Sequence, residues 1–278
     1  MLIEGIQVPQ IFYGTAWKED RTKNLVTLAL EQGFRGIDTA NQRKHYNEAA
    51  VGEAIEEFIN RSSISRKDLF IQTKFTQLPG QDHRLPYDPH SSLPDQVEQS
   101  FSSSLGHLGI KTIDSYILHG PSTRNLITED DWAIWRTMED IYESGRARIL
   151  GVSNFSLEQL QELCQKARIL PHFVQNRCYA QKGWDSKIRS FCTAHNIVYQ
   201  GFSLLTANRQ LFEHPKLKEI ALRWNRDISQ IIFRFALDIG IIPLTGPRKT
   251  EHMQMDLDVF DFRLDIDDTK VIKLITKN

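Results

Sequence analysis

Residues 33–55 read GFRGIDTANQRKHYNEAAVGEAI, a short β-type run followed by a helical pattern. The strand-like run ends in a carboxylate at Asp38, and the stretch from residue 48 has apolar residues at helical spacing. Similar pairs of a short β-type run and a longer helical pattern follow one another along the whole chain, which is typical of βα units around a parallel sheet. The 278 residues suit a (β/α)8 barrel, which typically needs about 250.

We therefore predict a single (β/α)8 TIM barrel domain over residues 1–278, with a short β-hairpin within residues 3–9 and a terminal helix within residues 265–278. The expected barrel strands are 12–16, 35–39, 69–74, 115–119, 148–153, 172–176, 197–203 and 241–245. The expected helices are 21–32, 48–59, 94–107, 130–144, 156–167, 184–195, 215–238 and 249–256. Ser156 with Gln159, and Asp227 with Gln230, have the spacing of capping boxes at helix starts.

Residues 77–96 form a long proline-rich segment between the third strand and its helix. Loops of this length are uncommon and often functional. In a (β/α)8 barrel this loop emerges on the face that carries active sites. We expect it to form part of the pocket wall, the alternative being an insertion without a role.

The composition excludes several classes of partner. The chain has 34 basic and 35 acidic side chains, so its charge favours neither nucleic acid nor an anionic membrane. Cys164, Cys178 and Cys192 match neither a CxxC motif nor a zinc site, and we expect free thiols and no metal. The first residues do not resemble a signal peptide, and no apolar run reaches the roughly 20 residues of a membrane helix. We expect a cytoplasmic monomer.

Polar side chains close several of the predicted strands. Asp38 ends the second strand, Lys74 the third and His119 the fourth, and Ser153 and Asn154 end the fifth. Each alone has a structural explanation, such as a cap or a solvated strand end. Because the carboxyl ends of all strands face the same end of a barrel, we expect these groups to converge there, with Asp38 and Lys74 compensating each other's charge.

The chain resembles the aldo-keto reductase family in these strand ends and in the segments around them. Residues 33–55 resemble the family's GxRxIDTA segment, and LFIQTK, DSYILHGP, GVSNF and VQN follow in the family's order, so that the likeness extends from about residue 12 to VFDF at 259–262. The resemblance implies an NAD(P)H-dependent oxidoreductase that reduces small aldehydes and ketones to alcohols. Carried over by position, its catalytic residues are Asp38, Tyr46, Lys74 and His119.

The chemistry of carbonyl reduction explains these residue types. The cofactor supplies a hydride, so the protein must supply a proton. We expect Tyr46 to be the general acid, with its pKa lowered by Lys74, which Asp38 orients. His119 is expected to donate a hydrogen bond to the substrate oxygen. Tyr46 lies eight residues after Asp38, a longer gap than is common in the family, so His45 remains an alternative acid.

The resemblance also implies a cofactor site without a GxGxxG loop. NADP is the expected cofactor, with NAD open because Asp256 lies where an acidic group could bind ribose hydroxyls. The implied cofactor-binding residues are Thr15, Ser153, Asn154, Gln175, Phe202, Ser203, Leu205, Thr245, Gly246, Arg248 and Asp256. Trp17 and His119 are expected to contact the substrate.

Two other functions compete with this interpretation. The first is a non-catalytic NADP(H)-binding barrel that senses redox state through a protein partner. The second is a glycosidase, which needs two carboxyl groups at the scissile bond. The predicted strand ends offer only Asp38 as a clear candidate.

Overall fold

The computed structural model describes residues 2–275. Eight parallel strands close into a barrel in the order β10-β3-β4-β5-β6-β7-β8-β9. The strands are β3 Phe12–Gly14, β4 Gly36–Asp38, β5 Phe70–Phe75, β6 Ser115–Leu118, β7 Leu150–Ser153, β8 Phe173–Arg177, β9 Val198–Phe202 and β10 Ile241–Thr245. Each overlaps a predicted strand, so the predicted (β/α)8 TIM barrel is confirmed.

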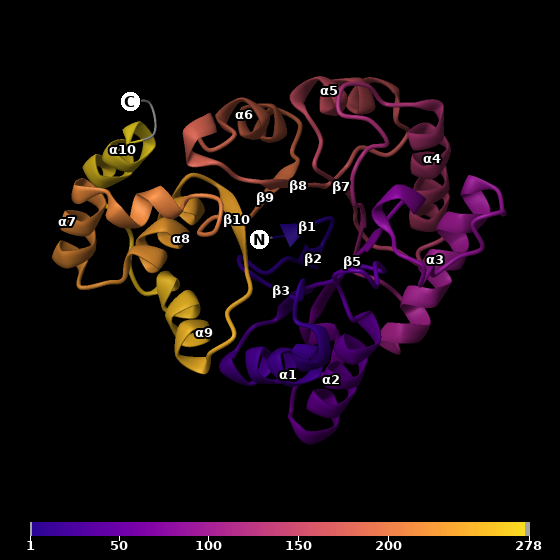
Figure 1. Cartoon of the computed structure of the whole chain (residues 1–278), viewed down its shortest axis with the longest axis horizontal. Helices are drawn as coiled ribbons and strands as arrows, with labels where there is room; N and C mark the ends of the chain where they lie inside the picture. Colours follow the sequence, from indigo (N-terminus) through magenta and orange to yellow (C-terminus); the bar gives the residue numbers. More distant parts are fainter. Residues whose placement is uncertain (1, 276–278) are drawn as a thin grey trace.

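The helices surround the ring of strands (Figure 1). They are α1 Thr22–Gln32, α2 Glu48–Arg61, α3 Leu93–Leu108, α4 Glu129–Glu143, α5 Leu157–Lys166, α6 Ser186–Ala194, α7 Pro215–Trp224, α8 Ile228–Asp238, α9 Thr250–Leu257 and α10 Ile266–Leu274. Helix α10 confirms the predicted terminal helix, whose last residues, 276–278, lie outside the described residues. No helix within residues 2–275 is both long and apolar enough to span a membrane.

The predicted amino-terminal hairpin closes one end of the barrel. Strands β1 (Leu2–Ile3) and β2 (Ile6–Gln7) pair antiparallel and lie near the centre of the ring in Figure 1. Ile6 packs in one apolar cluster with Phe12, Phe70 and Phe173, the first residues of three barrel strands. The hairpin therefore covers the amino end of the barrel and leaves the carboxyl end open.

Capping explains one difference between prediction and structure. The predicted helix 215–238 is two helices, because Asn225 adopts a left-handed conformation (φ 49°) that ends α7. Asp227 and Gln230 then form the predicted capping box that starts α8. The capping box of Ser156 and Gln159 at the start of α5 is also confirmed.

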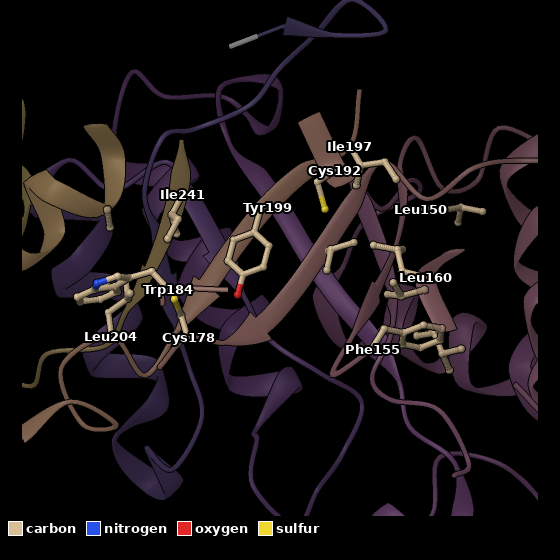
Figure 2. Close-up of a cluster of buried hydrophobic side chains, with 14 of the residues drawn as sticks. Leu150, Phe155, Leu160, Cys178, Trp184, Cys192, Ile197, Tyr199, Leu204 and Ile241 are labelled. Atoms are coloured by element: carbon tan, nitrogen blue, oxygen red, sulfur yellow. The ribbon is translucent and has the colours of Figure 1, made fainter. Parts of the chain in front are cut away.

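The largest apolar core lies between the strands and the outer helices. On the side of β7 to β10 it gathers the side chains shown in Figure 2, among them Leu150, Tyr199 and Ile241 from the strands and Cys192 from α6. Cys178 and Cys192 are buried here, and all three cysteines are free. Because burial raises the pKa of these thiols, they are poor nucleophiles.

The proline-rich loop does not form the pocket wall that the sequence predicts. None of residues 77–92, all of which the structure describes, lines the large cavity of the barrel. The loop packs beside β5 instead, with the Tyr87 ring 5.7 Å from that of Phe75 and the Tyr87 hydroxyl donating to the Thr76 carbonyl. These contacts hold the loop against the end of β5, outside the cavity.

A glycine sets the close approach of α2 to α3. A Cβ on Gly52 would lie 2.0 Å from the backbone oxygen of His107, whereas a Cβ on Gly106, within α3, would meet nothing within 4 Å. We expect Gly52→Ala to lower the free energy of unfolding by about 1–3 kcal/mol through overpacking. Gly106→Ala is the matched control, expected to raise it by about 0.5–1 kcal/mol through helix propensity.

Thermal and urea unfolding of both variants measure the difference. Equal stability of the two variants would contradict the close approach of the helices at Gly52.

Candidate active site

A cavity of about 740 Å³ opens at the carboxyl ends of the strands. This volume is within the range of small-molecule sites. The predicted residues that line it are Trp17, Asp38, Tyr46, His119, Ser153, Asn154, Gln175, Phe202, Ser203, Leu205, Thr245, Gly246 and Asp256. Thr15, Lys74 and Arg248 do not line it.

A buried ion pair lies at the floor of the cavity. The Lys74 ammonium donates to both carboxylate oxygens of Asp38 at 2.7 Å and to the Thr39 carbonyl at 2.8 Å. Both side chains are almost completely buried. An ammonium has three N–H donors, so these contacts use all of them. Thr15, an expected cofactor residue that does not line the cavity, donates its hydroxyl to the backbone carbonyl of Asp38.

Three glutamines complete the polar layer inside the barrel. Gln72 and Gln175 each donate an amide hydrogen to the Asp38 carboxylate, at 2.7 and 3.0 Å. Both also donate to the Gln200 side-chain oxygen, and Gln200 donates back to Gln72. These bonds give the buried carboxylate three side-chain partners, which offsets its desolvation.

Tyr46 lies beside this ion pair but does not bond to it. The Lys74 ammonium is 5.2 Å from the centroid of the Tyr46 ring, and the ring of His119 lies 6.0 Å away edge-on. Within residues 2–275 the Tyr46 hydroxyl has no hydrogen-bond partner and is not sealed from solvent, so it is free to meet a ligand.

The predicted lowering of the Tyr46 pKa is wrong for this structure. Burial, followed by the negative charge of Asp38, raises the pKa of the phenol above its usual value. The physical reason is that burial disfavours the charged phenolate, and the Asp38 charge offsets that of the Lys74 ammonium, whose donors are all taken by Asp38 and Thr39. The phenol is therefore protonated at neutral pH, which is the form that can donate a proton.

His119 is neutral. Burial, with a smaller contribution from Lys74, lowers the pKa of its imidazole to about 3. Its Nδ1 atom lies 2.6 Å from the Thr76 hydroxyl, and its backbone carbonyl accepts a hydrogen bond from Asn154. A neutral imidazole can donate one hydrogen bond without adding a charge to the cavity.

The extra residues between Asp38 and Tyr46 form a turn. The His45 and Tyr46 amides both donate to the Gln42 carbonyl, which folds residues 42–46 back on themselves. The His45 ring lies against that of Trp17, tilted by 35° with centroids 3.8 Å apart, and it does not line the cavity. The turn thus places Tyr46 at the cavity and His45 behind the exposed Trp17 ring.

The opposite wall carries amides, a hydroxyl and an aromatic ring. Gln175 uses both amide hydrogens within the barrel, so its oxygen is the atom left for a ligand. Asn154 donates to Ser153 and to His119, which leaves its own side-chain oxygen open. Phe202 lines the same wall, with the Arg177 guanidinium 5.8 Å from its ring centroid.

Two residues of the same wall have left-handed backbone conformations. Asn154 and Ser203 both have positive φ angles, 60° and 58°. Non-glycine residues rarely adopt this conformation, and such residues cluster at functional sites.

Two loops meet across the mouth of the cavity. Lys18, after β3, lines the cavity and donates to the Gly246 carbonyl, after β10. Arg248 in the second loop donates to the Trp17 carbonyl. Burial, with the nearby Arg248 and Arg21 charges, lowers the pKa of the Lys18 ammonium to about 8.

Asp256 on α9 lies close to these two loops. It accepts a hydrogen bond from the Thr245 hydroxyl at 2.6 Å, and burial raises the pKa of its carboxyl to about 7.

Several of these residues were missed in the sequence. One of them is Lys18, which lines the cavity. The others are Thr76, Gln72 and Gln200, each of which contacts a predicted site residue. Gln72 carried a usable signal, because a residue two positions before Lys74 in the same strand must share its face.

Comparisons with known proteins agree with this architecture. A sequence model described as the Aldo/keto reductase family matches residues 10–277. The uncharacterized oxidoreductase YtbE of Bacillus subtilis (strain 168) is 33% identical over 279 residues, covering 100% of this chain and 92% of that protein. Glyoxal reductase of the same organism is 28% identical over 281 residues, with coverages of 100% and 92%.

A solved structure is similar over nearly the same length. MGS-M4, an aldo-keto reductase from a Medee basin deep-sea metagenome library, matches with a TM-score of 0.84 and 28% identity, covering 99% of this chain and 94% of its own. Together with the family match over residues 10–277, this shows that the chain belongs to the aldo/keto reductase family of oxidoreductases.

Proposed function

We propose that this protein reduces aldehydes and ketones to alcohols with NADPH, and that Tyr46 is the general acid. The observation that carries the proposal is the meeting of three groups at the cavity: the protonated Tyr46 phenol, the neutral His119 imidazole and the Lys74–Asp38 ion pair. A small dicarbonyl such as glyoxal is a first candidate substrate, because a relative 28% identical to this chain is named glyoxal reductase.

The polar groups of the opposite wall fit a nicotinamide. A carboxamide has an NH2 donor pair and an acceptor oxygen, and the open oxygens of Gln175 and Asn154 match the donors. The Ser153 hydroxyl has a hydrogen left to donate to the carboxamide oxygen. Phe202 supplies a ring for stacking. When bound, the reduced nicotinamide would supply the hydride that the protein lacks.

The side chains of the floor divide the remaining work. His119 donates a hydrogen bond to the carbonyl oxygen and stabilises the negative charge that develops there. Tyr46 then transfers its proton to that oxygen, which the raised phenol pKa permits because an alkoxide is a stronger base than a phenolate. The Lys74 charge, 5.2 Å from the ring, stabilises the phenolate left behind.

NADPH is the preferred cofactor because the mouth of the cavity is cationic. Lys18 lines the cavity, and Arg248 and Lys249 lie in the loop before α9. These charges suit the phosphates of NADPH. The Asp256 carboxylate would repel these phosphates. Its raised pKa weakens the repulsion, because the carboxyl is partly neutral near pH 7. NAD remains the alternative cofactor.

The second candidate is the non-catalytic redox sensor. It shares the cofactor site but needs no proton donor beside a carbonyl. Mixing the protein with NADPH and a panel of aldehydes that includes glyoxal, and following absorbance near 340 nm, separates the two functions. Tight NADPH binding without oxidation by any carbonyl would favour the sensor.

Replacing the proposed acid tests the mechanism. Tyr46→Phe should lower kcat by about 100-fold or more, because general acid catalysis contributes on this scale. The affinity for NADPH, measured by fluorescence titration, should be unchanged. Tyr142→Phe is the control, since its hydroxyl contacts Glu4 of the amino-terminal hairpin turn. Wild-type turnover by Tyr46→Phe would assign the proton to His119 or His45.

The pH dependence of cofactor affinity tests the role of Asp256. Below pH 7 its carboxyl is mostly protonated and neutral, and above pH 7 it ionises and repels the 2′-phosphate. NADPH affinity should therefore fall by about 10-fold, or about 1.4 kcal/mol, as pH rises from 6 to 8. Asp256→Asn should lessen this fall, while the titrations of the Lys18 ammonium, whose pKa is about 8, and of the phosphate itself remain. An identical pH profile for the variant would place the carboxyl away from the phosphate.

A further inference from the structure

A hydrogen bond from the residue just before the proline-rich loop reaches the candidate active site. Thr76 follows β5, is 5% exposed, and lies with its hydroxyl 2.6 Å from the Nδ1 atom of His119, which follows β6. The bond connects a residue outside the cavity lining to His119, which lines the cavity.

The direction of this hydrogen bond follows from the partners of Thr76. Within residues 2–275, the Thr76 hydroxyl has no hydrogen-bond partner other than His119. If the imidazole donated from Nδ1, the hydroxyl hydrogen would be buried without an acceptor, which costs free energy. The hydroxyl therefore donates to Nδ1. Since the imidazole is neutral, its one hydrogen is on Nε2.

The loop holds Thr76 in place. The Thr76 carbonyl accepts hydrogen bonds from the Tyr87 hydroxyl at 2.9 Å and from the Gln81 side-chain amide at 3.2 Å. The His119 amide in turn donates to the Phe75 carbonyl, next to Thr76. The strand end, the loop and the histidine are thus joined by hydrogen bonds on both sides of Thr76.

We propose that Thr76 is a positioning residue, anchored by Tyr87 and Gln81, that fixes His119 as the Nε2–H tautomer and holds this donor toward the cavity. The proposal rests on the proposed reductase function for its catalytic consequence. It gives the proline-rich loop a role that does not require contact with a ligand. The tautomer itself is a property of the free protein.

The tautomer is measured without substrate or cofactor. In protein labelled with ¹⁵N-histidine, two-bond ¹H–¹⁵N spectra report which ring nitrogen carries the hydrogen, and a His119→Asn sample assigns the signals among the nine histidines. We expect Nε2 protonated and Nδ1 unprotonated from pH 6 to pH 8. A hydrogen on Nδ1, or a ring that becomes charged in this range, would overturn the proposal even if the enzyme is an active reductase.

Variants measure the consequence for turnover. Thr76→Val keeps the shape but removes the hydroxyl, and should lower kcat/KM for glyoxal by about 10-fold or more with unchanged NADPH affinity. Thr76→Ser should restore most of the loss, and Tyr87→Phe should give a smaller loss in the same direction. Thr137→Val is the matched control, because among the described residues its hydroxyl bonds only to the Ala133 carbonyl of the same helix, α4. Its kcat/KM should equal that of the wild type.

The outcomes separate this proposal from the proposed function. Wild-type kcat/KM in a folded Thr76→Val, or no rescue by Thr76→Ser, would overturn the positioning role. If Thr76→Val does not fold, Tyr87→Phe and the wild-type spectra still decide it. An inactive wild type with the expected Nε2–H spectrum would refute the reductase while supporting the tautomer.

Discussion

The ion pair between Lys74 and Asp38 is the constraint on which the site depends. Two charges removed from water are costly, and loss of one partner from such a pair typically destabilises a protein by about 3–5 kcal/mol. The barrel meets this cost with hydrogen bonds: all three Lys74 donors are used, and Gln72 and Gln175 donate to the same carboxylate. The polar layer is therefore satisfied within the protein and needs no ligand to hold its geometry.

Burial, together with this saturation, determines the protonation of the neighbouring groups. Lys74 has no donor left for Tyr46, so the ammonium acts on the phenol only through its field, and burial keeps the phenol protonated. His119 lies near the same positive charge and is buried, so it stays neutral. The result is a cavity floor that offers two hydrogen-bond donors, a phenol and an imidazole, without an exposed charge. A carbonyl oxygen is an acceptor and suits such a floor.

The sequence predicted the elements better than it predicted their contacts. Strand ends with Asp38, Lys74 and His119 were recognisable because ionisable groups at the ends of apolar runs are unusual. Gln72 and Gln200 were missed because an amide within a strand has no such mark, and only closure of the barrel brings them onto Asp38. Thr76 was missed because its partner is 43 residues away. The loop was misplaced because its length predicts a function but not the side on which it packs.

The extra turn before Tyr46 shows which part of the site is constrained. Asp38 is fixed at the end of β4 by the ion pair, and α2 is fixed by the close contact of Gly52 with α3. Tyr46 lies just before α2, so its position is determined by the helix and not by the number of residues that separate it from Asp38. Adding residues to a closed loop costs little, because closure entropy grows only with the logarithm of its length. The spacing can therefore change while the phenol remains beside the ammonium, and the added residues are free to support Trp17 through His45.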